Sequence, residues 1–500
     1  MSNAHSDVKQ NTGKTYEAII IGSGFGGQIA ALNLTKEGIT DFLILERRDF
    51  MGGTWCQNTY PGAAVDVPSP LYSISSEPYD WSQMFAEQHE LHEYTNHVID
   101  KHGLREKTQT SANVNKIQWD EAQQLWFIHV DGKAEPYCSR FVINASGPLS
   151  TPVIPNFKGR DSFKGKSFHT NNWEHSYDYK GKRVAIIGSG ASAAQVIPAI
   201  APDVAHLDVF QRTPHWVLPR PDRVFSGWQR KLLRNKWFYK ALRTSIYWAL
   251  EFRVVGFKYS QLALEIIGGR KARAFIKQQI ADPEMQRKVT PDFTLGCKRV
   301  ILSSTLYPAY CRDNVTLHDK HNGIKEITEK GIITQDGVEH ELDLIIYSTG
   351  YDATDGVISY PVIGCEGKTI AEFWQDYPRA YLGTALPGFP NLFIVTGPNT
   401  GIGHTSALFL IESQMQYIMH SIKAVRQGGH QSVEVKPDAE QKYTDHIHQE
   451  MKKTVWQTGG CNSWYKSKSG KVIAMFPGFS FTFRRWANNF KKADHQFADK

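Results

Sequence analysis

Two glycine-rich turns in this chain have the spacing of dinucleotide-binding loops. They read Gly22-Ser23-Gly24-Phe25-Gly26-Gly27 and Gly188-Ser189-Gly190-Ala191-Ser192-Ala193. Each follows an apolar run typical of a strand, at residues 16–21 and 183–187, and precedes a segment with helical character. Glycines in this context permit a tight turn and let a pyrophosphate approach the N-terminus of the next helix. The sequence therefore predicts two dinucleotide sites.

The residue that ends the following strand differs between the two sites. Nineteen positions after Gly27, the apolar run 41–45 ends at Glu46, a carboxylate suited to accept hydrogen bonds from ribose hydroxyls. Nineteen positions after Ala193, the run 207–211 ends at Arg212 and Thr213, a cation and a hydroxyl suited to a 2′-phosphate. We predict FAD or NAD at the first site and NADP at the second.

Length and composition favour a soluble enzyme of two or three domains. The chain has 500 residues and a mean hydropathy of −0.41, and no uninterrupted apolar stretch is long enough for a transmembrane segment. The net charge of +7 is modest, and no basic block accompanies a nucleic-acid-reading motif. We expect neither a nucleic-acid partner nor a membrane span.

The cysteines give no sign of a metal or redox centre. Six are present, and they lie far apart without the spacing of a zinc site or of a redox-active cysteine pair, at Cys56, Cys138, Cys297, Cys311, Cys365 and Cys461. We therefore expect no metal and a location in the reducing cytoplasm.

Composition shifts along the chain predict an α/β fold with two Rossmann-like dinucleotide-binding domains. Residues 1–14 are expected to be a disordered lead, 15–147 the first part of an FAD-binding domain, 148–350 an inserted NADP-binding domain, and 351–500 the rest of the FAD domain. The loop 51–80 is long and rich in Gly, Pro and aromatic residues, so it is expected to face the cofactor. A segment at about 225–292 lacks β alternation and predicts inserted helices. Its basic and aromatic side chains could dock on a membrane surface, but packing over the active site is the expectation.

Two longer motifs resemble the sequence signatures of a known enzyme family. Gly52-Gly53-Thr54-Trp55, four residues, Tyr60-Pro61-Gly62, three residues and Asp66 match one signature of the flavin-dependent Baeyer–Villiger monooxygenases. Phe163, Gly165, His169 and Trp173 match the spacing of a second, although Glu174 follows where that family has Pro or Asp. The chain resembles this family from about residue 15 to residue 485.

The resemblance implies FAD and NADPH as cofactors, with molecular oxygen and a ketone as substrates. Such enzymes form a C4a-peroxyflavin that attacks the ketone and yields an ester or lactone. Lys298-Arg299 resembles the pair that carries the family's essential arginine, so Arg299 is the expected catalytic cation and Asp66 the residue that orients it. The expected FAD contacts are Gly22, Gly24, Gly27, Glu46, Thr54, Trp55, Asp66, Tyr72 and Val114, and the expected NADP contacts are Gly188, Gly190, Ser192, Ala193, Arg212, Thr213 and Lys298.

Other functions share parts of this pattern. A flavin monooxygenase that oxidises sulfur or nitrogen would use the same cofactor residues but would not need Arg299. A reductase acting on disulfides would need a suitably spaced cysteine pair, which the sequence does not contain. A noncatalytic redox sensor is a further alternative, because a fold does not imply a function. Neither the shape of the ketone nor the oligomeric state is predicted.

Overall fold

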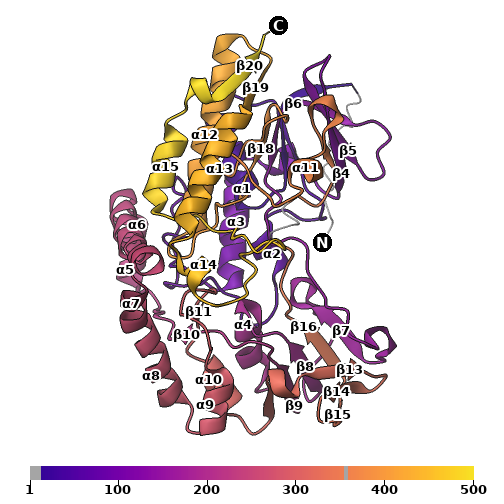
Figure 1. Cartoon of the computed structure of the whole chain (residues 1–500), viewed down its shortest axis with the longest axis vertical. Coiled ribbons are helices and arrows are strands. Elements are labelled where there is room, and N and C mark those ends of the chain that lie inside the picture. Colours follow the sequence, from indigo (N-terminus) through magenta and orange to yellow (C-terminus); the bar gives the residue numbers. More distant parts are fainter. Residues whose placement is uncertain (1–12, 354–357, 500) are drawn as a thin grey trace.

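A mixed β-sheet and a parallel β-sheet, in the upper and lower halves of Figure 1, form the framework of this computed structural model. It describes residues 13–353 and 358–499, so residues 1–12 of the expected N-terminal lead lie outside it. The upper sheet has the strand order β17-β4-β5-β6-β1-β2-β3, with β18 also paired to β6. Its strands are β1 (Thr15–Ile21), β2 (Phe42–Leu45), β3 (Thr108–Gln109), β4 (Val114–Asp120), β5 (Leu125–Val130), β6 (Tyr137–Asn144), β17 (Val362–Ile363) and β18 (Leu392–Ile394).

Distant parts of the chain share this upper sheet. β1 pairs in parallel with β2 and β6, and β18, some 250 residues after β6, pairs in parallel with β6 as well. The helices α1 (Phe25–Lys36) and α12 (Ala407–Gly428) pack against each other, and α15 (Ser480–Asn488) packs on α12. Strands that are buried on both faces must be apolar throughout, which explains the run of isoleucines in β1.

The lower sheet is wholly parallel, in the order β12-β9-β8-β16-β7. It contains β7 (Lys166–His169), β8 (Arg183–Ile187), β9 (His206–Phe210), β12 (Val315–His318) and β16 (Leu344–Tyr347), and α4 (Ala191–Ile200) follows β8. In both sheets the strand before the glycine turn lies between its successor and a strand that returns later, the order of a Rossmann fold. The predicted fold class is confirmed.

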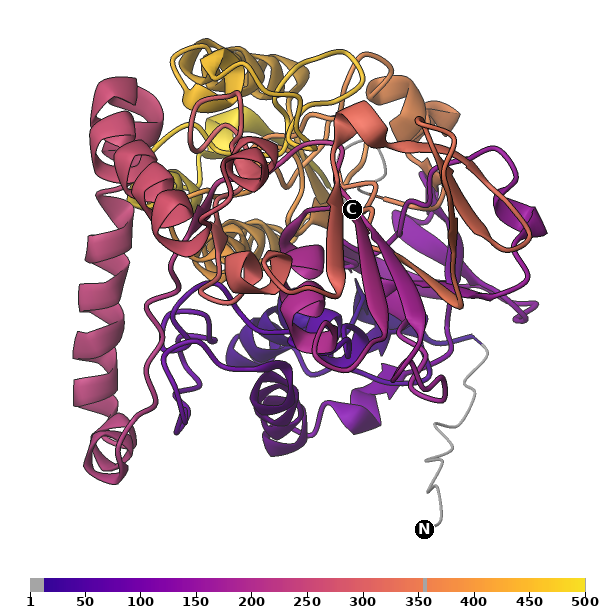
Figure 2. The same ribbon diagram turned by 90° about the horizontal axis from the view of Figure 1, so that it is seen from below.

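The inserted segment is helical. It forms α5 (Gly227–Leu233), α6 (Lys236–Glu251), α7 (Gln261–Leu264), α8 (Arg270–Gln279) and α9 (Pro283–Val289). The helices α5 to α8 line the left side of the molecule in Figure 1, and the long helix α6 stands at the same edge in Figure 2. No helix within the described ranges combines the length and the apolar character needed to cross a membrane.

The remaining α-helices and strands connect these parts. They are α2 (Thr54–Gln57), α3 (Gln88–Lys101), α10 (Leu306–Tyr310), α11 (Ile370–Phe373), α13 (Pro437–Met451), α14 (Val455–Thr458), β10 (Val217–Leu218), β11 (Ile301–Leu302), β13 (Ile324–Ile327), β14 (Gly331–Thr334), β15 (Glu339–Glu341), β19 (Ser432–Val435) and β20 (His495–Ala498). The loop 51–80 contains only α2 among these elements, so its conformation depends on tertiary contacts rather than on regular structure.

Candidate active site

The first glycine turn brings the N-terminus of α1 against the ends of β1 and β6. Gly22 has a φ of +101°, and a Cβ atom there would lie 2.6 Å from the carbonyl oxygen of Ala145. A Cβ on Gly27 would lie 2.0 Å from the carbonyl oxygen of Gly22. Gly53 faces the turn so closely that its Cβ would lie 2.7 Å from the Cα of Gly24. The turn and the start of the loop 51–80 therefore form one close-packed surface.

Glu46 lies directly beside this turn. The backbone N–H and the hydroxyl of Ser23 donate to Oε2 of Glu46 at 3.0 and 2.6 Å, and the backbone N–H of Arg48 donates to Oε1 at 3.0 Å. Two carboxylate oxygens offer about four acceptor positions, so capacity remains for a ribose hydroxyl. The backbone N–H of Ala112 donates to the carbonyl of Glu46, which brings the start of β4 to the same edge. Val114 is buried there, so its main chain is the part available to a cofactor.

Aromatic side chains fold the loop 51–80 back on itself. Nε1 of Trp55 donates to the hydroxyl of Tyr72 at 3.2 Å, and their rings meet edge to face with centroids 5.9 Å apart. Burial raises the pKa of Tyr72, so its hydroxyl stays protonated. Gln88 donates to the carbonyl of Trp55 at 2.7 Å. Thr54 remains exposed as the first residue of α2, next to Gly53.

The second glycine turn has the same construction. Gly188 has a φ of +131°, and a Cβ there would lie 2.2 Å from the carbonyl oxygen of Ser348 at the end of β16. At Gly190 no other atom lies within 4 Å of such a Cβ. Ser192 and the fully buried Ala193 form the first turn of α4. Gly188 is thus required for packing, whereas Gly190 leaves open space at the helix N-terminus, where a pyrophosphate is expected to bind.

Arg212 and Lys298 form a pair of neighbouring cations near this turn. Burial lowers the pKa of Lys298, and the charge of Arg212 lowers it further. Thr213 accepts a hydrogen bond from Ser189 through its carbonyl at 2.7 Å, which fixes the strand end to the glycine turn. Sequence reasoning missed His215, whose pKa is lowered to about 4 by burial and by the charge of Lys298. Its position two residues after Thr213 could have identified His215 as a candidate site residue from the sequence.

Arg299 and Asp66 meet where the two domains face each other. Nε and Nη2 of Arg299 donate to Oδ2 and Oδ1 of Asp66 at 2.8 and 2.5 Å, although the residues are 233 positions apart. The negative charge of Asp66 raises the pKa of Arg299 above its already high usual value, so the guanidinium is permanently charged. The arginine side chain is still 47% exposed. It is a fixed cation with donors left over for another group.

Tyr465 completes the surroundings of this pair. It is buried near Arg299 and Asp66. Burial raises its pKa to about 12, although the charge of Arg299 opposes that rise. Tyr60, in the loop signature, donates to Gln195 of α4 at 3.0 Å and so links the loop to the second domain. Its pKa is likewise raised to about 12 by burial.

The cysteines depart from the expectation that all are reduced. Cys297, two residues before Arg299, forms a disulfide with Cys461, 164 positions later. Local spacing cannot reveal a pair so far apart. The bond joins the segment that carries Lys298 and Arg299 to the C-terminal loop that carries Tyr465.

We expect the Cys461→Ser substitution to lower the melting temperature by roughly 5 °C or more, because a long loop in the unfolded chain is no longer closed. Differential scanning fluorimetry with and without a phosphine reductant measures this. The reductant should lower the melting temperature of the wild type but not of the variant. Cys365→Ser, which changes an unpaired cysteine, is the matched control. A wild-type melting temperature unaffected by reductant contradicts the prediction.

One cluster outside this region has the composition of a metal site. Asp208, His318 and His340 offer ligand atoms within 4.8 Å of one another, on β9, β12 and β15. His318 lies 2.7 Å from Oδ1 of Asp208 and His340 lies 3.3 Å from it. Hydrogen bonding to imidazole already satisfies this buried carboxylate, so we assign it no metal.

Comparisons with known proteins agree with this arrangement. Residues 19–237 match the family model described as pyridine nucleotide-disulphide oxidoreductase. The chain is 43% identical over 474 residues to a Baeyer-Villiger monooxygenase of Pseudomonas aeruginosa, covering 94% of this chain and 89% of that protein. It is 41% identical to one of Streptomyces coelicolor, covering 95% and 92%. Among solved structures, cyclohexanone monooxygenase in a closed form has a TM-score of 0.87 at 30% identity, covering 97% of this chain and 99% of that chain. An oxidized steroid monooxygenase bound to NADP has a TM-score of 0.87 at 27% identity, covering 97% and 100%.

Proposed function

The chain belongs to the Baeyer–Villiger monooxygenase family, and we propose that it converts a ketone to an ester or lactone with FAD, NADPH and molecular oxygen. The observation that carries this proposal is the bidentate Asp66–Arg299 pair at the junction of two dinucleotide-binding domains. When bound, FAD would accept a hydride from NADPH and activate oxygen. A solved relative, the OTEMO complex with FAD and NADP, supports this cofactor assignment at a TM-score of 0.86.

The residues around each turn fit the cofactor assigned to them. At the first turn, Gly22, Gly24 and Gly27 leave the N-terminus of α1 open to a pyrophosphate, and Glu46 has acceptor capacity for a ribose. Thr54, Trp55, Tyr72 and the main chain of Val114 would border the rest of FAD. At the second turn, Gly188, Gly190, Ser192 and Ala193 would hold the pyrophosphate of NADPH, and Arg212, Thr213 and Lys298 its 2′-phosphate.

Arg299 supplies what the reaction requires from the protein. Negative charge develops on oxygen as a carbonyl is attacked, and a preorganised cation stabilises that charge without reorganising. Asp66 engages two donors of the guanidinium and so orients the remaining donors. Tyr465 is buried near this pair. We propose Arg299 as the catalytic residue and Asp66 as the residue that positions it.

A product assay tests the proposed function against its nearest alternative. The purified enzyme is incubated with NADPH, oxygen, and a panel of cyclic, linear, aromatic and steroidal ketones alongside sulfides and tertiary amines. Ester or lactone formation supports the proposal. Oxidation of the sulfides or amines alone favours the heteroatom monooxygenase. Consumption of NADPH with hydrogen peroxide as the only product, for every compound, favours an oxidase or a sensor.

We expect the Arg212→Ala substitution to raise the KM for NADPH roughly 10- to 100-fold, because a charge-assisted contact with a phosphate contributes about 1.5–3 kcal/mol. The kcat should change little, since a contact made equally in the ground and transition states affects binding only. Steady-state kinetics with NADPH and NADH measures this, and NADH, which lacks the 2′-phosphate, is the internal control. An unchanged preference for NADPH over NADH contradicts the assignment.

The domain boundaries and the cellular compartment are also part of the proposal. We place the FAD-binding domain at 15–147 and 351–500 and the NADP-binding domain at 148–350, because the upper sheet takes its strands from the first two ranges and the lower sheet from the third. Four of the six cysteines are unpaired, at Cys56, Cys138, Cys311 and Cys365, which supports a reducing compartment such as the cytoplasm. The buried Cys297–Cys461 bond is the exception.

A further inference from the structure

The exposed apolar side chains of this protein gather on its inserted helices. Eighteen large apolar side chains are exposed among the described residues, and twelve of them lie within residues 224–267. These twelve are Val224, Trp228, Leu232, Trp237, Phe238, Trp248, Phe252, Val255, Tyr259, Leu262, Ile266 and Ile267. The sequence led us to expect these helices to pack over the active site; in the structure Tyr239 is buried, whereas Trp228, Trp237 and Trp248 are exposed. A concentration of this kind marks an interaction surface.

Helix α6 exposes large aromatic side chains on one face, while Tyr239, Tyr247 and Leu250 on the other face are buried in the core. Trp237, Trp248 and the C-terminal Phe252 are 81%, 44% and 66% exposed. Trp248 and Phe252 follow Trp237 by 11 and 15 residues, about three and four helical turns, so the three side chains lie on one face. At the C-terminal end of the helix, Glu251 is buried, accepts a hydrogen bond from the hydroxyl of Ser480 at 2.7 Å and lies 3.3 Å from His404. The inner face already covers the core, as the apolar face of a helix normally does, so the outer aromatic side chains form a second apolar surface.

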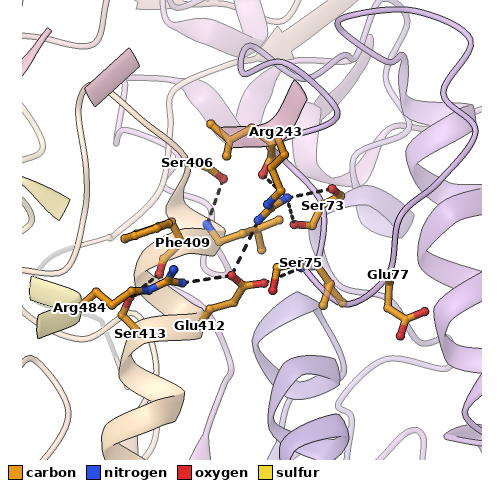
Figure 3. A network of polar contacts seen from close by, with 12 residues as sticks. Ser73, Ser75, Glu77, Arg243, Ser406, Phe409, Glu412, Ser413 and Arg484 are labelled. Atoms are coloured by element: carbon orange, nitrogen blue, oxygen red, sulfur yellow. Dashed lines mark hydrogen bonds and ion pairs between the residues drawn. The ribbon is translucent and has the colours of Figure 1, made fainter. Parts of the chain in front are cut away.

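Polar contacts hold α6 in this orientation. Figure 3 shows Arg243 of α6 directed at the loop that carries Ser73 and at Glu412 of α12. Nη1 of Arg243 donates to the carbonyl oxygen of Ser73 at 2.8 Å, and its Nη2 lies 3.7 Å from Glu412. Glu412 in turn pairs with Arg484 of α15 at 3.5 Å. The inner face is therefore fixed to the FAD-binding domain, and α6 cannot simply rotate to bury its tryptophans.

The same segment carries the protein's excess positive charge. Residues 224–271 contain ten Lys and Arg but only two Asp and Glu, a net charge of +8, whereas the whole chain carries +7. The rest of the molecule is thus almost neutral. Lys231, Lys236, Lys240 and Lys271 are exposed and form no ion pair with another residue in the described part of the chain. Exposed tryptophans beside free lysines are typical of helices that lie in a lipid interface.

We propose that residues 224–271, which we call the docking face, bind the surface of an anionic lipid membrane. The tryptophans and Phe252 would enter the headgroup region while the lysines contact lipid phosphates. Helices α5 to α8 lie along one side of the molecule, so they can meet a flat surface together (Figures 1 and 2). A second copy of the chain is a poor occupant, because the unpaired lysines of two such faces would repel each other and the cores of protein interfaces are depleted of charge.

Vesicle flotation of the FAD-loaded enzyme tests this proposal. Vesicles of phosphatidylcholine alone are compared with vesicles that also contain phosphatidylglycerol, at low and high salt. We expect binding to the anionic vesicles that weakens as salt increases. Two variants should each reduce that binding at least about tenfold: the aromatic variant W237S/W248S/F252S and the charge variant K231E/K236E/K240E. Val338→Ser, which changes an exposed apolar residue next to β15, is the matched control and should bind as the wild type does.

Folding and self-association are followed in the same samples. FAD absorbance and the melting temperature show that each variant is folded, independently of any ketone activity, so failure of this proposal is distinct from failure of the proposed function. Binding to anionic vesicles that both variants retain would overturn the proposal, as would no binding by the wild type. Mass photometry that shows wild-type dimers, aromatic-variant monomers and no vesicle binding would assign the face to a second copy instead.

Discussion

Replacing Arg299 by alanine should lower the rate of ketone oxidation by about a thousandfold or more while the protein stays yellow and reducible by NADPH. Arg299 lies beside Asp66 and Tyr465 and is not among the residues assigned to FAD or NADPH, so we expect both cofactors to stay bound. What is lost is the fixed cation that stabilises negative charge on oxygen, and removing a single preorganised donor alone costs about 100- to 1000-fold. Consumption of NADPH should continue and should yield hydrogen peroxide.

Three measurements on the same variant separate these effects. Anaerobic stopped-flow absorbance gives the rate of flavin reduction by NADPH, gas chromatography gives the ester, and a peroxidase assay gives hydrogen peroxide. Arg299→Lys is the matched control, because it keeps the charge but loses the bidentate geometry with Asp66, and it should retain partial activity. Normal ester formation by the alanine variant would refute the role of Arg299. A reduction rate that falls as far as the ester yield would move Arg299 to NADPH binding.

The sequence predicted the two glycine turns because neighbouring residues alone determine their conformation. A tight turn that leaves a helix N-terminus open needs glycine at fixed spacing, and the strands around it are buried and hence continuously apolar. The predicted strand at residues 183–187 coincides with β8, and the run 16–21 differs from β1 by one residue. The contact between Asp66 and Arg299 was expected only from a family resemblance, since nothing local relates residues 233 positions apart.

Features that depend on tertiary contacts could not be predicted from the sequence. The disulfide joins Cys297 to Cys461, and spacing rules cover only neighbouring cysteines. On α6, periodicity identifies two faces but not which of them is buried. The inner face turned out to contain Arg243 and Glu251, whose charges are satisfied by partners on distant elements. The polarity of these two residues predicts exposure, but burial of a paired charge depends on its partner, which the local sequence does not show.

The glycines of the first turn provide a second test with a large expected effect. In a Gly27→Ala variant, the new Cβ would lie 2.0 Å from the carbonyl oxygen of Gly22, and both groups belong to the backbone. Neither can move without separating α1 from β1, so the pyrophosphate-binding end of the helix is displaced. We expect the affinity for FAD to fall about 100-fold or more, which corresponds to about 3 kcal/mol, and the apoprotein to melt at a lower temperature.

Gly24→Ala is the informative partner of that variant. A Cβ on Gly24 has 3.5 Å to the Cα of Gly53, an ordinary contact, so the protein should fold normally. We expect Gly24, which has no side chain, to let a pyrophosphate come close to the turn. The variant should therefore still lose FAD affinity, while its apoprotein melts like the wild type. Flavin titration followed by fluorescence, together with scanning fluorimetry of the apoproteins, separates the two cases. Full FAD binding by Gly24→Ala would mean that the cofactor does not approach this turn, and the assignment of FAD to the first domain would have to be withdrawn.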